Sequence, residues 1–111
     1  MSGHADVTDL PVLAGELLTE ARSQHAKRAA RTLVAGTVQR ATLIALAEGA
    51  EVTEHRAPAA ATLYVVTGRV TLRTHGQEWD LGEGKLAHLP PQRHGLQAVT
   101  DAVVLLTVAL R

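Results

Sequence analysis

The feature that most limits the fold of this chain is a series of short strand-like runs that begins after residue 31. Turn signals such as His75-Gly76 and Pro90-Pro91 separate these runs. Short strands at regular spacing, with no helical pattern between them, are typical of an antiparallel sandwich or barrel. We therefore expect strands over residues 32–34, 38–46, 62–67, 69–74, 77–81, 86–89, 96–99 and 102–110.

The part of the chain before these runs predicts one helix. An apolar stripe at spacings of three and four residues consists of Leu10, Leu13, Leu17, Leu18, Ala21 and His25. Asp9 can cap the start of this helix, and Pro11 falls in its first turn, where a missing N–H costs little. We therefore divide the chain into an N-terminal segment with an amphipathic helix, residues 1–31, and a β-barrel, residues 32–111.

Charge and composition exclude several classes of function. The 11 Lys and Arg residues balance the 11 Asp and Glu residues, whereas a nucleic-acid-binding domain normally carries a basic excess. The absence of cysteine excludes disulfides, thiolate nucleophiles and cysteine-ligated metals. No apolar run approaches the length of about 20 residues that a membrane-spanning helix needs. We expect a cytoplasmic protein with no nucleic-acid partner and no membrane contact, since the start of the chain also lacks a signal-peptide pattern.

Aromatic residues are scarce, because the chain has no Phe, one Trp and one Tyr. The core must therefore consist of Leu, Val, Ile and Ala side chains. We expect Trp79 to pack on the barrel or to close a hairpin rather than to stack on a ligand. The six histidines become the main candidates for chemistry.

Two segments carry glycine, histidine and proline at spacings that resemble the two signature motifs of the cupin superfamily. In the first, Gly49, His55 and Gly68 stand at the expected positions. In the second, Gly84 and Pro90 match the opening of the motif, and His94 arrives one residue early. The resemblance implies an all-β fold, a small cupin-like (jelly-roll) β-barrel, which the N-terminal α-helix precedes.

The resemblance also implies one divalent metal, such as Zn, Fe, Mn or Ni, held at the barrel mouth by three histidines and one glutamate. Ala57 stands at the position of the second histidine, and Ala61 stands at that of the glutamate. An alanine methyl cannot coordinate, so only His55 and His94 remain of the usual ligands. Zinc sites in proteins use about three or four protein ligands, and the motif therefore lacks a complete metal site.

We expect a small molecule to bind in the barrel, because the alanines enlarge its cavity and apolar walls with a few polar groups are typical of ligand pockets. The polar groups would come from His55, His94, Tyr64, Gln92 and Arg93. The role would be sensory, regulatory or metabolite-binding. The two histidines could instead fill polar gaps at the barrel mouth, hydrogen-bonded to backbone carbonyls.

The alternative is a metal-dependent enzyme of the isomerase, cyclase or oxygenase type. His88 or Glu51 would then supply a third ligand beside His55 and His94. The resemblance also implies a homodimer, since cupins often pair through edge strands and swapped N-terminal segments. The amphipathic helix and the apolar last run suit such pairing, although that run equally suits a central strand.

Overall fold

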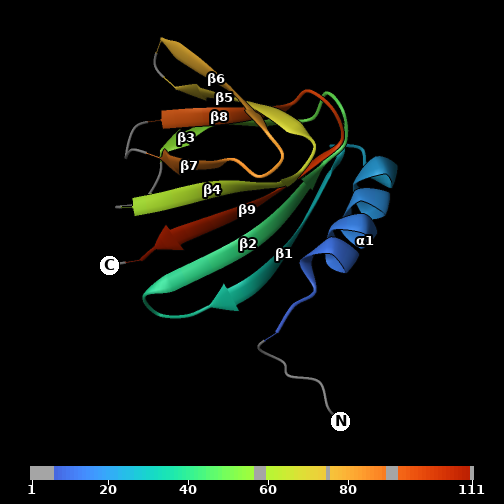
Figure 1. The fold of residues 1–111 in the computed structure, drawn as a ribbon, viewed down its shortest axis with the longest axis horizontal. Helices are drawn as coiled ribbons and strands as arrows, with labels where there is room; N and C mark the ends of the chain where they lie inside the picture. Colours follow the sequence, from blue (N-terminus) through green and yellow to red (C-terminus); the bar gives the residue numbers. More distant parts are fainter. Residues whose placement is uncertain (1–6, 57–59, 75, 90–92, 111) are drawn as a thin grey trace.

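Two antiparallel sheets face each other, and one helix lies outside them (Figure 1). The computed structural model describes residues 7–56, 60–74, 76–89 and 93–110, without the side chains of residues 54–56. One sheet has five strands in the order β1-β2-β9-β4-β7, and the other has four in the order β3-β8-β5-β6. The elements are α1 (Leu10–Ser23), β1 (Arg28–Ala35), β2 (Gln39–Leu46), β3 (Glu51–Arg56), β4 (Ala60–Thr67), β5 (Arg69–Thr74), β6 (Gln77–Gly82), β7 (Leu86–Leu89), β8 (Arg93–Ala98) and β9 (Ala102–Ala109).

This architecture confirms the predicted all-β fold with a preceding helix. The sequence did not predict β3, because its residues Glu-Val-Thr-Glu-His-Arg contain only one aliphatic side chain. Strand β1 begins at Arg28, so the five-stranded sheet includes residues that we assigned to the N-terminal segment. The helix begins as predicted, since the Asp9 carboxylate accepts a hydrogen bond from the Val12 N–H at 3.2 Å.

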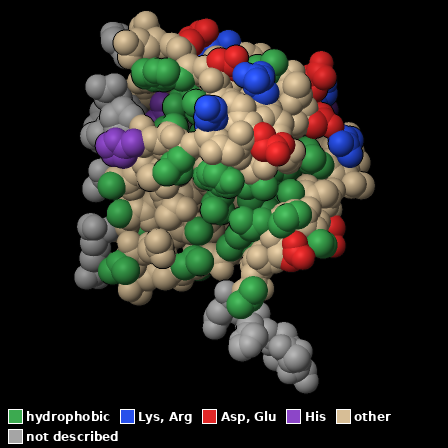
Figure 2. Space-filling model, in the orientation of Figure 1, with side chains coloured by type: hydrophobic (Ala, Val, Ile, Leu, Met, Phe, Trp, Pro, Cys, Tyr) green, Lys and Arg blue, Asp and Glu red, His purple; other side chains and the backbone are tan. Residues whose placement is uncertain are grey.

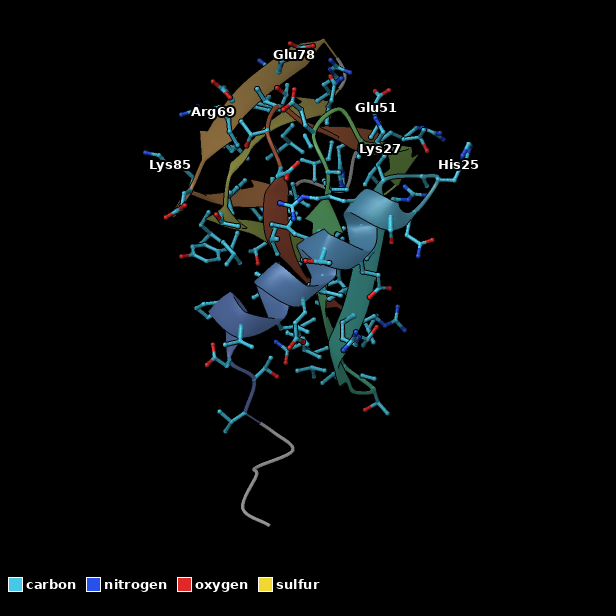
Figure 3. The ribbon with its side chains drawn as sticks, turned by 90° about the vertical axis from the view of Figure 1, so that its right-hand side faces the viewer. His25, Lys27, Glu51, Arg69, Glu78 and Lys85 are labelled. Carbon is cyan, nitrogen blue, oxygen red and sulfur yellow. The ribbon has the colours of Figure 1, made fainter. Side chains whose placement is uncertain are left out.

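Helix α1 covers part of the outer face of the five-stranded sheet (Figure 3). Its buried residues Ala14, Leu17 and Ala21 pack in one cluster with side chains of β1, β2 and β9. The predicted stripe is wrong at its end, because the helix ends at Ser23 and His25 lies beyond it, exposed (Figure 3). Within the described residues, no helix is long and apolar enough to cross a membrane.

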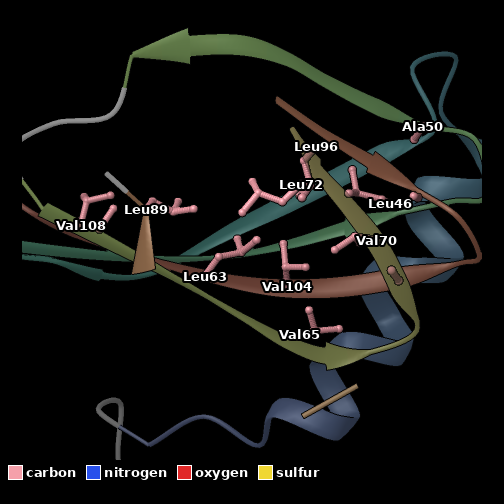
Figure 4. Close-up of a cluster of buried hydrophobic side chains, with 13 residues drawn as sticks. Leu46, Ala50, Leu63, Val65, Val70, Leu72, Leu89, Leu96, Val104 and Val108 are labelled. Carbon is pink, nitrogen blue, oxygen red and sulfur yellow. The ribbon is translucent and has the colours of Figure 1, made fainter. Parts of the chain in front are cut away.

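The main core lies between the two sheets. Its fully or nearly fully buried side chains come from both sheets, and Figure 4 labels Leu46, Ala50, Leu63, Val65, Val70, Leu72, Leu89, Leu96, Val104 and Val108 among them. The apolar last run is the central strand β9, hydrogen-bonded to β2 on one side and β4 on the other. The edges of β9 are therefore occupied within the chain, and the homodimer stays a prediction.

The sandwich has two different ends. We call the end with residues 47–50, 68 and 99–101 the closed end, and the end with Thr74, Leu89 and His94 the open end. At the closed end Gly68 has φ +84°, and a Cβ added there would lie 2.1 Å from the Asp101 carbonyl oxygen. Only glycine fits this close approach of two backbones.

The Asp101 carboxylate ties three segments together at the closed end. It accepts hydrogen bonds from the Glu48 N–H at 2.8 Å and from Arg22 Nη2 at 2.7 Å. The Glu48 N–H, and after it the Arg22 guanidinium, hold the pKa of Asp101 below its ordinary value. One side chain thus joins the end of α1 to the turns that follow β2 and β8.

Candidate functional site

The backbones of His55 and His94 lie opposite each other in the ladder between β3 and β8. An irregularity between Val52 and His55 shifts the register, since Val52 pairs with Leu96 whereas His55 pairs with His94. The irregularity adds one residue to β3. In a regular ladder, Glu54 would instead occupy the position opposite His94. The two histidines of the motifs are therefore neighbours along the backbone ladder, while the His55 side chain lies outside the described part of the structure.

His94 is a buried polar residue at the open end. Its exposed fraction is 6%, and that of Thr74, which pairs with it in the ladder between β5 and β8, is 8%. The Thr74 hydroxyl donates a hydrogen bond to the Arg93 carbonyl oxygen at 3.2 Å. These two polar side chains lie at the boundary between the apolar core and an open space.

Two spaces meet at His94. The inner cavity, of about 40 Å³, is lined by His94, Gly95 and the aliphatic side chains Ile44, Val52, Leu63, Leu72, Leu89, Leu96 and Leu106. The second space, which we call the open-end cleft, has a volume of about 360 Å³. The inner cavity has room for about one to three water molecules, whereas ligand pockets run from about 300 to 1,000 Å³. Of these two spaces, the open-end cleft is therefore the one whose volume suits a small molecule.

The open-end cleft lies between the edge strands β6 and β7 of the two sheets. Its walls are Leu72 and Thr74 of β5, Trp79 and Leu81 of β6, Leu86, Ala87, His88 and Leu89 of β7, and His94 of β8. Leu72, Leu89 and His94 also line the inner cavity, so the two spaces share one wall. Among the wall residues that the structure describes, none is Asp, Glu, Lys or Arg.

Among the wall residues that the sequence analysis missed, which include Thr74, Trp79 has the largest side chain. It pairs with the buried Leu72 in the ladder between β5 and β6, and opposed residues in such a pair share one face of the sheet. Trp79 nevertheless remains 42% exposed because it stands on an edge strand. The signal was available, since Trp79 and Leu81 alternate with Glu78 and Asp80 along the run.

The structure does not bring every predicted ligand-binding residue to the open end. Tyr64 is 37% exposed and pairs with Leu86 and Leu105, on the face of β4 opposite to the buried Leu63 and Val65. The exposed Arg93 is absent from the walls of both spaces. Gln92 lies outside the described residues. Of the predicted site residues, His94 and His88, the latter predicted only as a possible metal ligand, line the cleft.

The side chains that the structure describes do not form a metal site. Among the described side chains no group of three His, Asp or Glu residues could hold an ion. Glu51 lies 3.6 Å from Arg73 in an ion pair on the outside of the four-stranded sheet, and His88 is exposed on β7. Ala61, at the position of the missing glutamate, is buried in the core and offers only a methyl group.

Charged side chains gather on the outside of the four-stranded sheet. Arg73 donates to Glu78 Oε2 at 2.9 Å and to Gln97 Oε1 at 2.7 Å, and Arg69 donates to Asp80 at 3.0 Å. Glu78 and Arg69 project away from the sandwich in Figure 3. Figure 2 shows charged side chains mainly in the upper part and along the right-hand side of its view, and hydrophobic ones grouped in its middle. The charges are paired with each other, away from the cleft.

Comparisons with known proteins agree with this architecture. A family model described as "Cupin domain" matches residues 42–109, which include every wall residue of the two spaces. A conserved protein of unknown function from Streptococcus pyogenes is similar over 99% of this chain and 91% of its own, with TM-score 0.76 and 24% identity. A cupin superfamily protein from Desulfitobacterium hafniense matches over 76% and 78%, with TM-score 0.73 and 15% identity.

A third solved structure, that of KdgF from Halomonas sp., covers 76% of this chain and 79% of its own, with TM-score 0.69 and 22% identity. At such identities the likeness concerns the fold alone. No curated protein matches the chain.

Proposed function

The chain belongs to the cupin family, and from that premise we propose that it binds a small, mainly apolar molecule in the open-end cleft. The role would be sensory, regulatory or metabolite-binding. The observation that carries the proposal is a ligand-sized space of about 360 Å³ that ends on the buried His94. Apolar walls with a few polar groups that fix orientation are the usual make-up of such sites.

The arrangement of the walls supports binding over mere incomplete packing. Leu72 and Leu89 provide apolar contact at the inner end, and Leu81 and Ala87 provide it on either side. A ligand would bury these side chains from water, which contributes about 25 cal/mol per Å² of apolar surface. His94 and Thr74 place hydrogen-bonding groups at one position in that apolar wall. They would orient a polar group of the ligand.

The alternative function, a metal-dependent enzyme, would use His55 and His94 with a third ligand. The paired backbones of the two histidines favour this alternative. The positions of Glu51 and His88 speak against it, since the first is held in an ion pair outside the sheet and the second is exposed. Metal analysis of protein purified without a histidine tag tests it. Stoichiometric metal that is lost in His94→Ala would replace our proposal with the enzyme.

A fragment screen by thermal unfolding tests the proposed binding. A fragment present at ten times its Kd should raise the Tm by roughly 5 °C for a chain of this size. In Ala87→Phe the new ring would fill the open-end cleft, and the shift should disappear. The matched control is Ala60→Phe, at an exposed position of β4 outside the cleft walls, where the shift should persist. The proposal would be contradicted if no fragment raised the Tm, or if the fragments that raise it did so equally in Ala87→Phe.

A further inference from the structure

We infer that the open-end cleft selects a neutral molecule with a planar ring, which makes its main contact with Trp79. This inference rests on the proposed function and adds the chemical class of the ligand. It depends on three observations: the exposed indole, the uncharged walls and the volume of the cleft.

The first observation is the position of Trp79. It is the single tryptophan of the chain, and it stands on an edge strand with 42% of its surface exposed. The other apolar wall residues that the structure describes are aliphatic, so Trp79 offers the largest flat surface among the described walls. Aromatic pairs gain roughly two- to twelve-fold in affinity beyond the burial of their area. A planar ring would gain this from Trp79, whereas a puckered saturated ring would not.

The second observation is that no Asp, Glu, Lys or Arg is among the described residues of the cleft walls. The polar wall residues are Thr74, His88 and His94. The arginine closest in sequence to Thr74, Arg73, is held by Glu78 and Gln97 on the outside of the sheet. A carboxylate or ammonium group in the cleft would lose hydration without gaining a guanidinium, ammonium or carboxylate partner. The walls therefore favour a neutral ligand with one hydrogen-bonding group.

The third observation is the volume. At about 360 Å³ the cleft lies near the lower limit of the usual range of about 300 to 1,000 Å³. The inner cavity behind Leu72 and Leu89 adds only about 40 Å³. The volume of the cleft thus suits a ligand of one or two rings.

Three probes of similar size separate the effect of a planar ring from the effect of charge. Benzamide is planar and neutral, cyclohexanecarboxamide has the same amide on a puckered ring, and benzoate is planar and charged. Binding is measured by ligand-observed NMR titration and by the fluorescence of Trp79, the single tryptophan. We expect benzamide to bind about two- to twelve-fold more tightly than cyclohexanecarboxamide and more tightly than benzoate.

The variant Trp79→Leu should bring the affinity for benzamide down to that for cyclohexanecarboxamide in the NMR titration. The control is Tyr64→Leu, which removes the other aromatic residue of the chain from an exposed position outside the cleft walls, and which should leave the preference unchanged. Both positions are exposed, and thermal unfolding checks that each variant folds.

Equal binding of the two amides, or a preference that survives Trp79→Leu, would overturn the role of Trp79 and leave the proposed function standing. Tighter binding of benzoate than of benzamide would overturn the inference that the ligand is neutral. If none of the three probes binds, the inferred ligand class is wrong, and the proposed function is then decided by the fragment screen with Ala87→Phe. If that screen also finds nothing, both fail.

Discussion

The two ends of the same sandwich differ in what their side chains do. The ladder between β5 and β8 runs from one end to the other, and its inward pairs change from Val70 with Ala98, through Leu72 with Leu96, to Thr74 with His94. The first pair is almost fully buried in the core, whereas the last is polar and borders a cleft of about 360 Å³. Strands β5 and β8 therefore contribute to the packed core at one end and to the cleft at the other.

This difference separates the well-packed core from the proposed binding site along the strands. The closed end combines buried aliphatic side chains with the hydrogen bonds of Asp101 and the close backbone contact at Gly68. The open-end cleft instead lies between the two edge strands β6 and β7, beside the exposed Trp79, so fewer atoms surround its side chains. Substitutions at the closed end should cost more stability than comparable ones at the open end.

The largest effect is expected from truncation of the core at the closed end. Leu46→Ala should lower the free energy of unfolding by about 3–5 kcal/mol, because a fully buried leucine leaves a cavity behind. Leu72→Ala should cost only about 2–3 kcal/mol, since Leu72 already borders both spaces. Urea unfolding measures both variants. An equal cost would contradict the distinction between the two ends.

The next effect concerns the backbone at the closed end. Gly68→Ala should cost about 3 kcal/mol or more, because the new Cβ would collide with the backbone of Asp101 and Ala102. The matched control is Gly84→Ala, which has nearly the same φ, +85° against +84°, but no atom within 4 Å of the added Cβ. We expect the control to cost about 1–2 kcal/mol for the positive φ alone. Urea unfolding gives the difference, and its absence would refute the role of close approach.

A smaller, pH-dependent effect is expected at Asp101. Asp101→Asn should lower the free energy of unfolding by about 1 kcal/mol at pH 7. The effect is small because solvent partly screens the ion pair, in which the side chain of Asp101 is 35% exposed and that of Arg22 is 55% exposed. The pKa of Asp101 is lowered in the folded state. Its contribution is therefore present above about pH 4 and is lost as the pH falls through the folded-state pKa.

The measurement is urea unfolding of the wild type and Asp101→Asn between pH 7 and the acid range. The two stabilities should converge as the pH falls, and a constant gap would contradict the assigned cause. The control is Asp80→Asn, whose partner Arg69 lies 3.0 Å away in an exposed ion pair. It should change stability by less than about 0.5 kcal/mol.

Much of this fold could be predicted from the sequence, because alternation and turn residues specify most strands locally. The start of α1 was predicted from Asp9 and Pro11, and the apolar run of β9 fits its central position. Strand β3 was missed because Glu51, Thr53, Glu54 and Arg56 make it too polar to recognise. Its pairing with β8 is a long-range property that no local pattern contains.

The candidate site could be predicted only in part. His94 was found through its motif, and the structure places it at the wall of both spaces. The location of the ligand-sized space was missed, since it depends on how the edge strands β6 and β7 lie, and so was Trp79. Tyr64 could not be assigned correctly to a face of the sheet, because β4 carries apolar residues on both faces.

The central claim is that small molecules bind at the open end. Chemical-shift mapping of the isotopically labelled protein with benzamide tests it most directly. We predict shifts at the Trp79 indole and around Leu72 and His94, with none at Leu46 and Ala50 of the closed end. Shifts confined to the surface around Tyr64, or no saturable shifts at all, would contradict the account.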